Sequence, residues 1–174
     1  MTPGADLVFP LPEAQLDRFF LQAVLGYPQP DEELLIVQAQ RHGHPLDRLE
    51  PVIGIDDLRA LQTAVEEVYI DPLLQRWVID LVRATRALPG VRTGSSVRGS
   101  LALERGARAM ALLRGREHVE PGDIEQLVEP VLAHRLLLSH AYALGGEASG
   151  DPVGLLDRCV EHAPRPRAAV AEPT

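Results

Sequence analysis

The stretch LPEAQLDRF occupies residues 11–19 and decides how the rest of the chain is interpreted. It sets two charged residues, Asp17 and Arg18, between the apolar Leu16 and Phe19. Taken alone, this pattern indicates no more than a surface ion pair beside a helix end. Around it, the spacing predicts one helical turn from Glu13, and the apolar run at 19–24 has the length of a strand.

Farther along the chain, apolar residues recur at helical spacing and predict a bundle of helices. One helix start is marked by Asp71 before Pro72, a capping acid followed by a proline in the first turn. The low aromatic content, 4% within a hydrophobic fraction of 45%, favours helix packing over a β-sandwich. The fold class is therefore mainly α, a helical bundle preceded by a short strand and helix piece. The predicted helices are 31–40, 56–68, 72–88, 96–114, 121–132 and 151–162.

These helices predict buried faces as well as boundaries. In the first helix the expected buried residues are Leu34, Leu35 and Val37. In the helix at 96–114 they are Leu103, Ala107, Met110 and Leu113. Gly145 to Gly150 predicts a linker, and the Pro- and Ala-rich end after Pro164 predicts disorder.

Composition excludes several classes of function. The net charge of −8 repels nucleic acid and anionic lipid, and all 17 cationic residues are arginines. No apolar run approaches about 18 residues, so membrane insertion is not expected, and the first residues do not resemble a secretory signal. The single Cys159 cannot form an internal disulfide, which favours a reducing, cytoplasmic location.

The nine residues 11–19 resemble the end of the AAA+ core in the MoxR family, whose members carry the same string before their lid. The resemblance implies that Arg18 is an arginine finger and that Asp17 orients its segment. A planar guanidinium can contact two phosphate oxygens of a neighbouring subunit's nucleotide at once. In GTPases such fingers contribute roughly 10³ to 10⁵ in rate.

A second segment, TGSSVRGS at 93–100, resembles the MoxR motif glycine-alanine-serine-proline-arginine-alanine that opens a lid helix. The resemblance implies that Arg98 is the sensor 2 arginine, with Ser95 and Ser96 supporting the helix start. The pattern departs from the family at Val97, where the motif has proline, and at Gly99, where it has alanine. The unspecific alternative is a solvated arginine at a helix start.

The stretch from 107 to 136 also resembles the MoxR lid, where we expect structural residues. His134 and Arg135 could face a neighbouring subunit, and the sequence leaves this open. The expected organisation is the edge of the AAA+ core with the finger segment at 1–30, a helical lid at 31–144, and a linker, short helix and tail at 145–174.

The sequence lacks the residues that bind ATP and Mg²⁺. A P-loop ends in Gly-Lys-Ser/Thr, and the chain has no lysine. No strand ends in paired acids, and the six histidines show no metal-ligand spacing. The family resemblance, which covers roughly 9–166, thus implies ATP and Mg²⁺ in a full member but neither bound by this chain alone, which we expect to be inactive by itself.

Three origins stay open: a truncated ATPase, one part of a split ATPase, or a freestanding helical module that binds proteins without catalysis. The resemblance further implies a hexamer-like homo-oligomeric ring or a separate AAA+ core as partner. It also implies chaperone-like remodelling of client proteins, with von Willebrand factor A-domain proteins as further partners. The client itself is not indicated.

Overall fold

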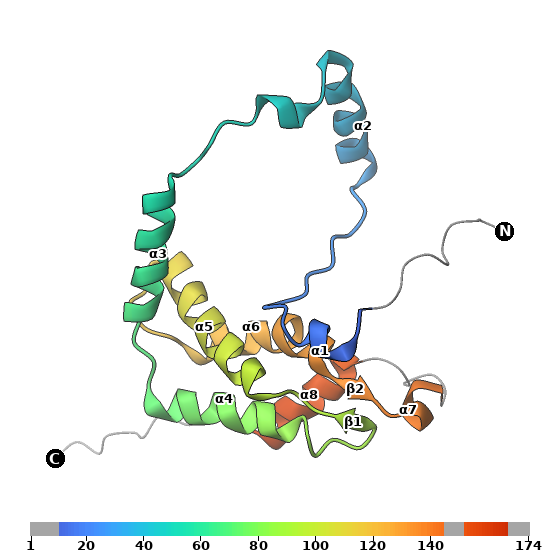
Figure 1. Cartoon of the computed structure of the whole chain (residues 1–174), viewed down its shortest axis with the longest axis vertical. Helices are drawn as coiled ribbons and strands as arrows, with labels where there is room; N and C mark the ends of the chain where they lie inside the picture. The colour runs from blue at the N-terminus through green and yellow to red at the C-terminus, as the bar shows by residue number, and fades with distance from the viewer. Residues whose placement is uncertain (1–10, 145–151, 167–174) are drawn as a thin grey trace. The chain divides into compact units, whose positions relative to one another are not determined.

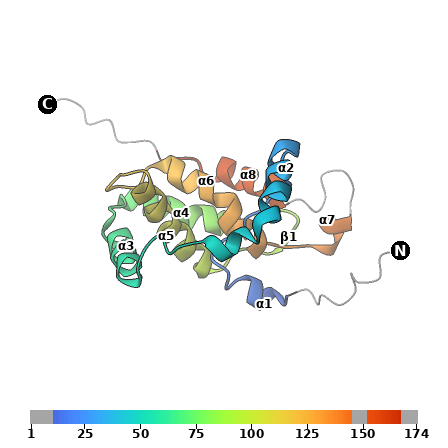
Figure 2. The same ribbon diagram turned by 90° about the horizontal axis from the view of Figure 1, so that it is seen from above.

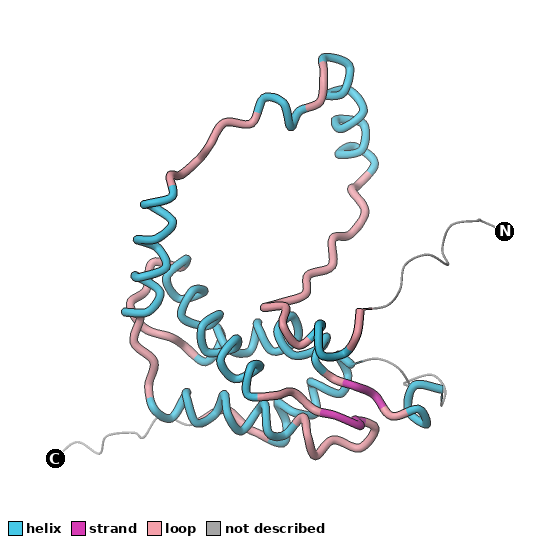
Figure 3. The backbone as a smooth tube through the Cα atoms, in the orientation of Figure 1, coloured by secondary structure: helices cyan, strands magenta, loops and turns pink. Residues whose placement is uncertain are grey.

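The computed structural model describes residues 11–144 and 152–166. The chain groups into two compact units. The larger unit comprises residues up to 22 and from 65 onward, and the smaller comprises 23–64. The predicted domain boundaries stay a prediction. Figure 1 labels the helices and strands, and Figure 3 colours them by type.

The core of the larger unit lies between four helices. These helices are α4 (Pro72–Ala84), α5 (Val97–Leu113), α6 (Pro121–Leu132) and α8 (Pro152–His162). Figures 1 and 2 both show α5 alongside α6, and α8 also packs against α4 and α6. Leu81, Leu103, Ile124 and Leu155 are fully buried between them. The mainly α prediction and the helices at 96–114, 121–132 and 151–162 are confirmed, and the helix predicted at 72–88 is confirmed except that it ends at Ala84.

The sequence signals explain how α4 forms. The Asp71 carboxylate accepts a hydrogen bond from the Leu73 backbone N–H at 2.7 Å, and Pro72 follows as the first helical residue. Apolar side chains then recur three and four residues apart and enter the core. Trp77 adds a buried hydrogen bond from Nε1 to the Ala163 carbonyl, at 2.6 Å, which ties α4 to the residue after α8.

Short elements complete the larger unit. Helix α1 (Glu13–Leu16) is the first helix of the described chain, and a 3₁₀ turn at Ala133–Arg135 follows α6. Strands β1 (Val91–Thr93) and β2 (Leu137–Leu138) pair antiparallel, and α7 (His140–Leu144) follows β2. This strand pair was not predicted from the sequence, because its strands are too short to show an alternating pattern.

The strand predicted at 19–24 is wrong, because the described backbone there is irregular and exposed. A strand needs a partner for its backbone groups. Here the Phe19 and Phe20 carbonyls accept hydrogen bonds from the Arg135 side chain instead, and the Gln22 N–H donates to the Pro130 carbonyl at 2.8 Å. The backbone is thus satisfied by the end of α6 and the turn after it.

The smaller unit contains α2 (Pro30–Ala39), 3₁₀ turns at Gln40–His42 and Pro45–Arg48, and most of α3 (Ile55–Glu67). The helix predictions at 31–40 and 56–68 are confirmed. The buried face predicted for α2 is wrong, because Leu34, Leu35 and Val37 are each more than half exposed. Spacing shows which side of a helix is apolar, whereas burial depends on what packs against it.

One burial prediction in α5 also fails. Leu103 and Ala107 are fully buried and Met110 packs partly against the core, as expected, but Leu113 is 84% exposed in the last turn. The helix stops there, and Gly115 follows with φ of 71°. The predicted linker at 145–150 lies outside the described residues, as does most of the predicted tail.

Among the described residues, no helix combines the length and the apolar character needed to cross a membrane.

Candidate functional site

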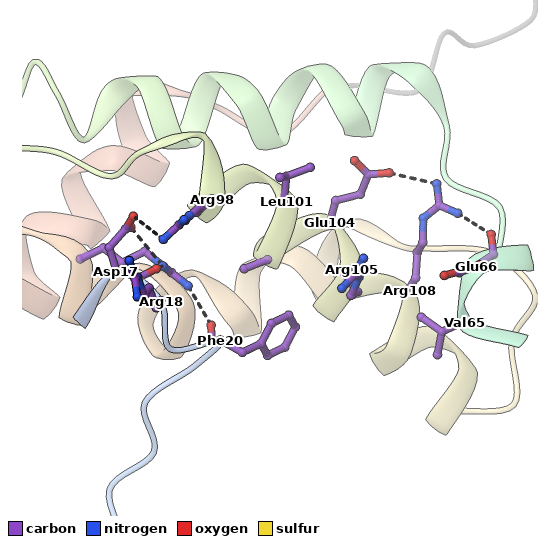
Figure 4. A pocket seen from close by; sticks show the side chains of 12 residues that line it. Asp17, Arg18, Phe20, Val65, Glu66, Arg98, Leu101, Glu104, Arg105 and Arg108 are labelled. Carbon is purple, nitrogen blue, oxygen red and sulfur yellow. Dashed lines mark hydrogen bonds and ion pairs between the residues drawn. The ribbon is translucent and has the colours of Figure 1, made fainter. Parts of the chain in front are cut away.

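A cleft of about 420 Å³ opens along α5 in the larger unit. It is formed by the segment after α1, the last residues of α3, one face of α5 and the side chain of Arg135. Figure 4 shows Asp17, Arg18 and Arg98 at one end of the cleft, with Arg105 and Arg108 farther along α5. Its charged lining residues are the arginines 18, 98, 105, 108 and 135 and the acids 17, 66 and 104.

Arg18 reaches this cleft from the irregular segment after α1. Its side chain is exposed, and it makes no hydrogen bond or ion pair with the part of the chain that the structure describes. All five N–H donors of its guanidinium are therefore available to a ligand.

Arg98 is the second residue of α5, at the end where backbone N–H groups have no partner within the helix. Ser96 caps the helix, and its Oγ accepts the Arg98 backbone N–H at 3.2 Å. The Arg98 guanidinium is 57% exposed and lies 4.0 Å from the Asp17 carboxylate, Nη1 to Oδ2. A long, half-exposed ion pair of this kind leaves most of the guanidinium free.

Asp17 joins the two predicted motifs. Its carboxylate accepts hydrogen bonds from the Ser96 hydroxyl, at 3.1 Å to Oδ1 and 3.0 Å to Oδ2. It also accepts one from Arg135 Nη1, at 3.2 Å to Oδ1. Four of the five residues singled out in the sequence, 17, 18, 96 and 98, therefore lie together although about 80 positions separate the motifs.

Ser95, the fifth, lies apart from the cleft and is fully buried. Its N–H donates to Thr85 Oγ1 at 2.9 Å, and its carbonyl accepts from Arg86 Nε at 3.0 Å. A Cβ on Gly99 would stand 2.1 Å from the Ser95 Oγ, which real Cβ atoms never approach. In this structure the departure from alanine at position 99 thus makes room for the buried serine.

Arg105 and Arg108 were not predicted from the sequence, and Arg135 was not assigned to the site. Arg98, Leu101, Arg105 and Arg108 are spaced three and four residues apart, so they share one face of α5. That spacing was the available signal. Arg108 is held by Glu104 at 2.9 Å and by the Glu66 carbonyl at 2.8 Å.

The lining residues suit an anion with several oxygens. Guanidinium groups bind phosphate and carboxylate oxygens bidentately. Of the five arginines that line the cleft, Arg108 and Arg135 donate within the chain, whereas Arg18 and Arg98 keep free donors. The described residues contain no group of three His, Cys, Asp or Glu side chains that could hold a metal ion. The lining of the cleft is therefore suited to an anion.

The single thiol supplies no further chemistry. Cys159 is fully buried in α8, and burial raises its pKa to about 11. At neutral pH it is a thiol without access to substrate, and the thiolate is the reactive form.

Residues 83–152 match the family model of the AAA lid domain. The chain is 44% identical over 130 residues to the uncharacterized protein YeaC of Bacillus subtilis, covering 75% of this chain and 41% of that protein. It is 36% identical to the chaperone MoxR1 of Mycobacterium tuberculosis, covering 84% and 40%, and 35% identical to the protein MoxR of Paracoccus denitrificans, covering 82% and 48%.

A solved structure extends the similarity to the fold. The crystal structure of a candidate ATPase from Cytophaga hutchinsonii superimposes with a TM-score of 0.80 at 27% identity. The match covers 91% of this chain and 50% of that one. The chain thus spans half, or less, of the length of the relatives that it matches.

Proposed function

This chain belongs to the MoxR family of AAA+ ATPases, corresponding to the C-terminal portion that includes the lid, and we propose that it delivers two guanidinium groups to a bound nucleotide. Arg18 acts as the arginine finger and Arg98 as the sensor 2 residue. The ATP and its Mg²⁺ are held by a P-loop core that this lysine-free chain does not contain.

One observation carries the proposal. Arg18 and Arg98 come from motifs far apart in the sequence, yet both line the same cleft. Both also keep free donors, since Arg18 has no partner among the described residues and Arg98 has only the ion pair at 4.0 Å. Arginines that served only to hold the fold would donate hydrogen bonds to other groups of the chain.

The chemistry of the two groups follows from their permanent charge. Negative charge on the phosphate oxygens grows or shifts as the γ-phosphoryl group is transferred, and a guanidinium held beside those oxygens stabilises it. Because the two arginines share one cleft, they act on the same phosphate chain. An arginine finger acts on the nucleotide of an adjacent subunit, so this role requires an oligomer. We therefore place that phosphate chain in a neighbouring subunit of a ring.

The wider role follows the family. ATP hydrolysis in the assembled ring, in the cytoplasm, drives chaperone-like remodelling of client proteins, and von Willebrand factor A-domain proteins are candidate partners. Alone, the chain does not hydrolyse ATP. It contributes the charge that completes an active site built by other residues.

The test joins this chain to the part of Mycobacterium tuberculosis MoxR1 that precedes the matched region, and measures ATP hydrolysis. Arg18→Ala should lower kcat by about 10³-fold or more while ATP affinity changes little, because the finger acts on the transferring phosphoryl group. Arg18→Lys is the matched control, since it keeps the charge but loses the planar fork. Full activity in the Arg18→Ala protein would refute the assignment.

A non-enzymatic interaction module is the second candidate, and the smaller unit favours it. In α2 four consecutive apolar side chains, Leu34 to Val37, are more than half exposed. A surface of this kind suits a protein partner. If this were the whole function, Arg18→Ala and Arg98→Ala would leave every activity of the assembly unchanged.

A further inference from the structure

Arg135 contacts the finger segment, defined here as residues 17–22, and its side chain is only 2% exposed. We propose that Arg135 is a positioning residue that fixes the backbone on both sides of Arg18 and so aims the finger from the lid of the same chain. This inference rests on the proposed role of Arg18. The sequence had left open whether Arg135 faces a neighbouring subunit, and in this structure it faces its own chain.

The guanidinium of Arg135 donates mainly to backbone carbonyls. Nη1 donates to the Asp17 carbonyl, and Nη2 donates to the carbonyls of Phe19 and, at 3.1 Å, Phe20. Nε donates to the Val131 carbonyl at 2.8 Å, which locks the side chain against the end of α6. The peptide groups before and after Arg18 are therefore held by one buried cation.

Two further contacts hold the same segment to the same place. The Gln22 N–H donates to the Pro130 carbonyl, and the His134 ring nitrogen Nε2 lies 3.2 Å from the Phe19 carbonyl. The described segment pairs with no strand, and its apolar side chains are only partly buried, with Phe19 54% and Phe20 42% exposed. The long-range hydrogen bonds that hold its backbone come from residues 130–135.

The Asp17 carboxylate extends this arrangement to the second arginine. It accepts from Arg135 on one side and from Ser96, the cap of α5, on the other, and it pairs with Arg98. Arg135 and Asp17 together tie the backbone that carries Arg18 to the start of α5, where Arg98 lies. A movement of the lid would therefore carry the finger with it.

The first test measures hydrogen exchange by NMR on the chain itself. The amides to follow are those of Arg18, Phe19 and Gln22, which donate to the Gln15, Leu16 and Pro130 carbonyls. Arg135→Lys keeps the charge but cannot bridge three carbonyls. We expect exchange at these amides to rise about tenfold or more, with protection in α4, α5 and α6 unchanged, because only a local opening becomes easier.

The matched control is Arg92→Lys, which alters an exposed ion pair between Arg92 and Glu13, and its exchange pattern should equal that of the unmodified chain. Asp17→Asn is a second variant that leaves Arg135 in place, and it decides the matter if Arg135→Lys does not fold. Unchanged exchange in both variants would overturn the proposal. Uniform loss of protection through the helices in the variants that fold would also overturn it, as it would show a merely structural role.

The second readout separates this inference from the finger assignment. In the ATPase joined to the MoxR1 part, Arg135→Lys should lower kcat by about 10- to 100-fold with KM for ATP retained, since a displaced finger costs charge stabilisation and not binding. A rise in KM for ATP with kcat unchanged would contradict the proposal. If Arg18→Ala has no effect, the finger assignment fails, while the exchange experiment still decides whether Arg135 positions the segment.

Discussion

Two clusters of one acid and two arginines occur in the larger unit, and they are used differently. In the first, Asp123 is fully buried, and Arg116 donates to both of its oxygens, at 2.7 and 2.9 Å. Arg114 adds a contact at 2.7 Å, and the Glu120 backbone N–H adds one at 2.8 Å. In the second, Asp17 is 28% exposed and binds Arg135, while Arg98 stays at 4.0 Å.

The difference lies in the donors that are left over. Arg114 also donates to Gln126, and Arg116 donates to the His118 carbonyl. Both arginines of the first cluster therefore use their donors within the fold. Around Asp17, the buried Arg135 also uses its donors within the fold, but Arg98 and the adjacent Arg18 keep free donors. Arginines beside an acid therefore indicate a ligand site only when their donors remain available.

The largest expected difference between the two clusters is the loss of stability when each acid is replaced by alanine. Asp123→Ala leaves two guanidinium groups without their acceptor and should lower the free energy of unfolding by about 3 kcal/mol. Asp17→Ala, at a partly exposed site, should cost about 1 kcal/mol. Urea denaturation of both variants measures the difference, and equal losses would show that the two clusters are not distinct in kind.

The pKa of the Asp123 carboxyl agrees with a structural role. Burial alone would raise this pKa, but the hydrogen bond from Arg116, the Glu120 N–H and the charges of both arginines hold it below its usual value. The ionised carboxylate is thus the form that the fold stabilises.

A smaller effect concerns His134, which contacts the finger segment. Burial is the largest influence and lowers its pKa below the usual 6.5, although the Phe19 carbonyl raises it. The unfolded chain then binds a proton more readily than the folded one, so stability should fall as pH drops below about 6.5.

The measurement is the denaturation midpoint between pH 7 and pH 5. His134→Gln should flatten this dependence, whereas His140→Gln, which removes an exposed histidine in α7, should leave it as it is. If the denaturation midpoint of the His134→Gln protein depends on pH as in the unmodified chain, His134 does not cause the loss of stability at low pH.

How far the sequence predicts this molecule depends on whether the signal is local. Helices such as α4 are marked by a cap, a proline and apolar spacing within one segment, so their positions follow from the sequence. The motif residues at 17, 18, 96 and 98 were identified from their strings, and their juxtaposition required the structure. No local pattern predicted that Arg135 would bind the carbonyls at 17, 19 and 20, because these hydrogen bonds join residues more than 110 positions apart.

The errors have a related cause. The run at 19–24 has the composition of a strand, but the backbone there is satisfied by the turn after α6 rather than by a neighbouring strand. The apolar face of α2 is real, yet within the described residues nothing buries it. Both predictions assumed a partner that a local pattern cannot supply.

Subunit mixing tests the central claim most directly. One form of the ATPase joined to the MoxR1 part carries Arg18→Ala or Arg98→Ala with an intact P-loop, and the other keeps both arginines but has its P-loop lysine replaced by alanine. Each is expected to be inactive or strongly impaired alone. If both guanidinium groups reach one phosphate chain in the neighbouring subunit, mixing should restore ATP hydrolysis for the Arg18 and the Arg98 variant alike. Mixed rings that assemble but stay inactive, or that recover with only one of the two variants, would contradict the account.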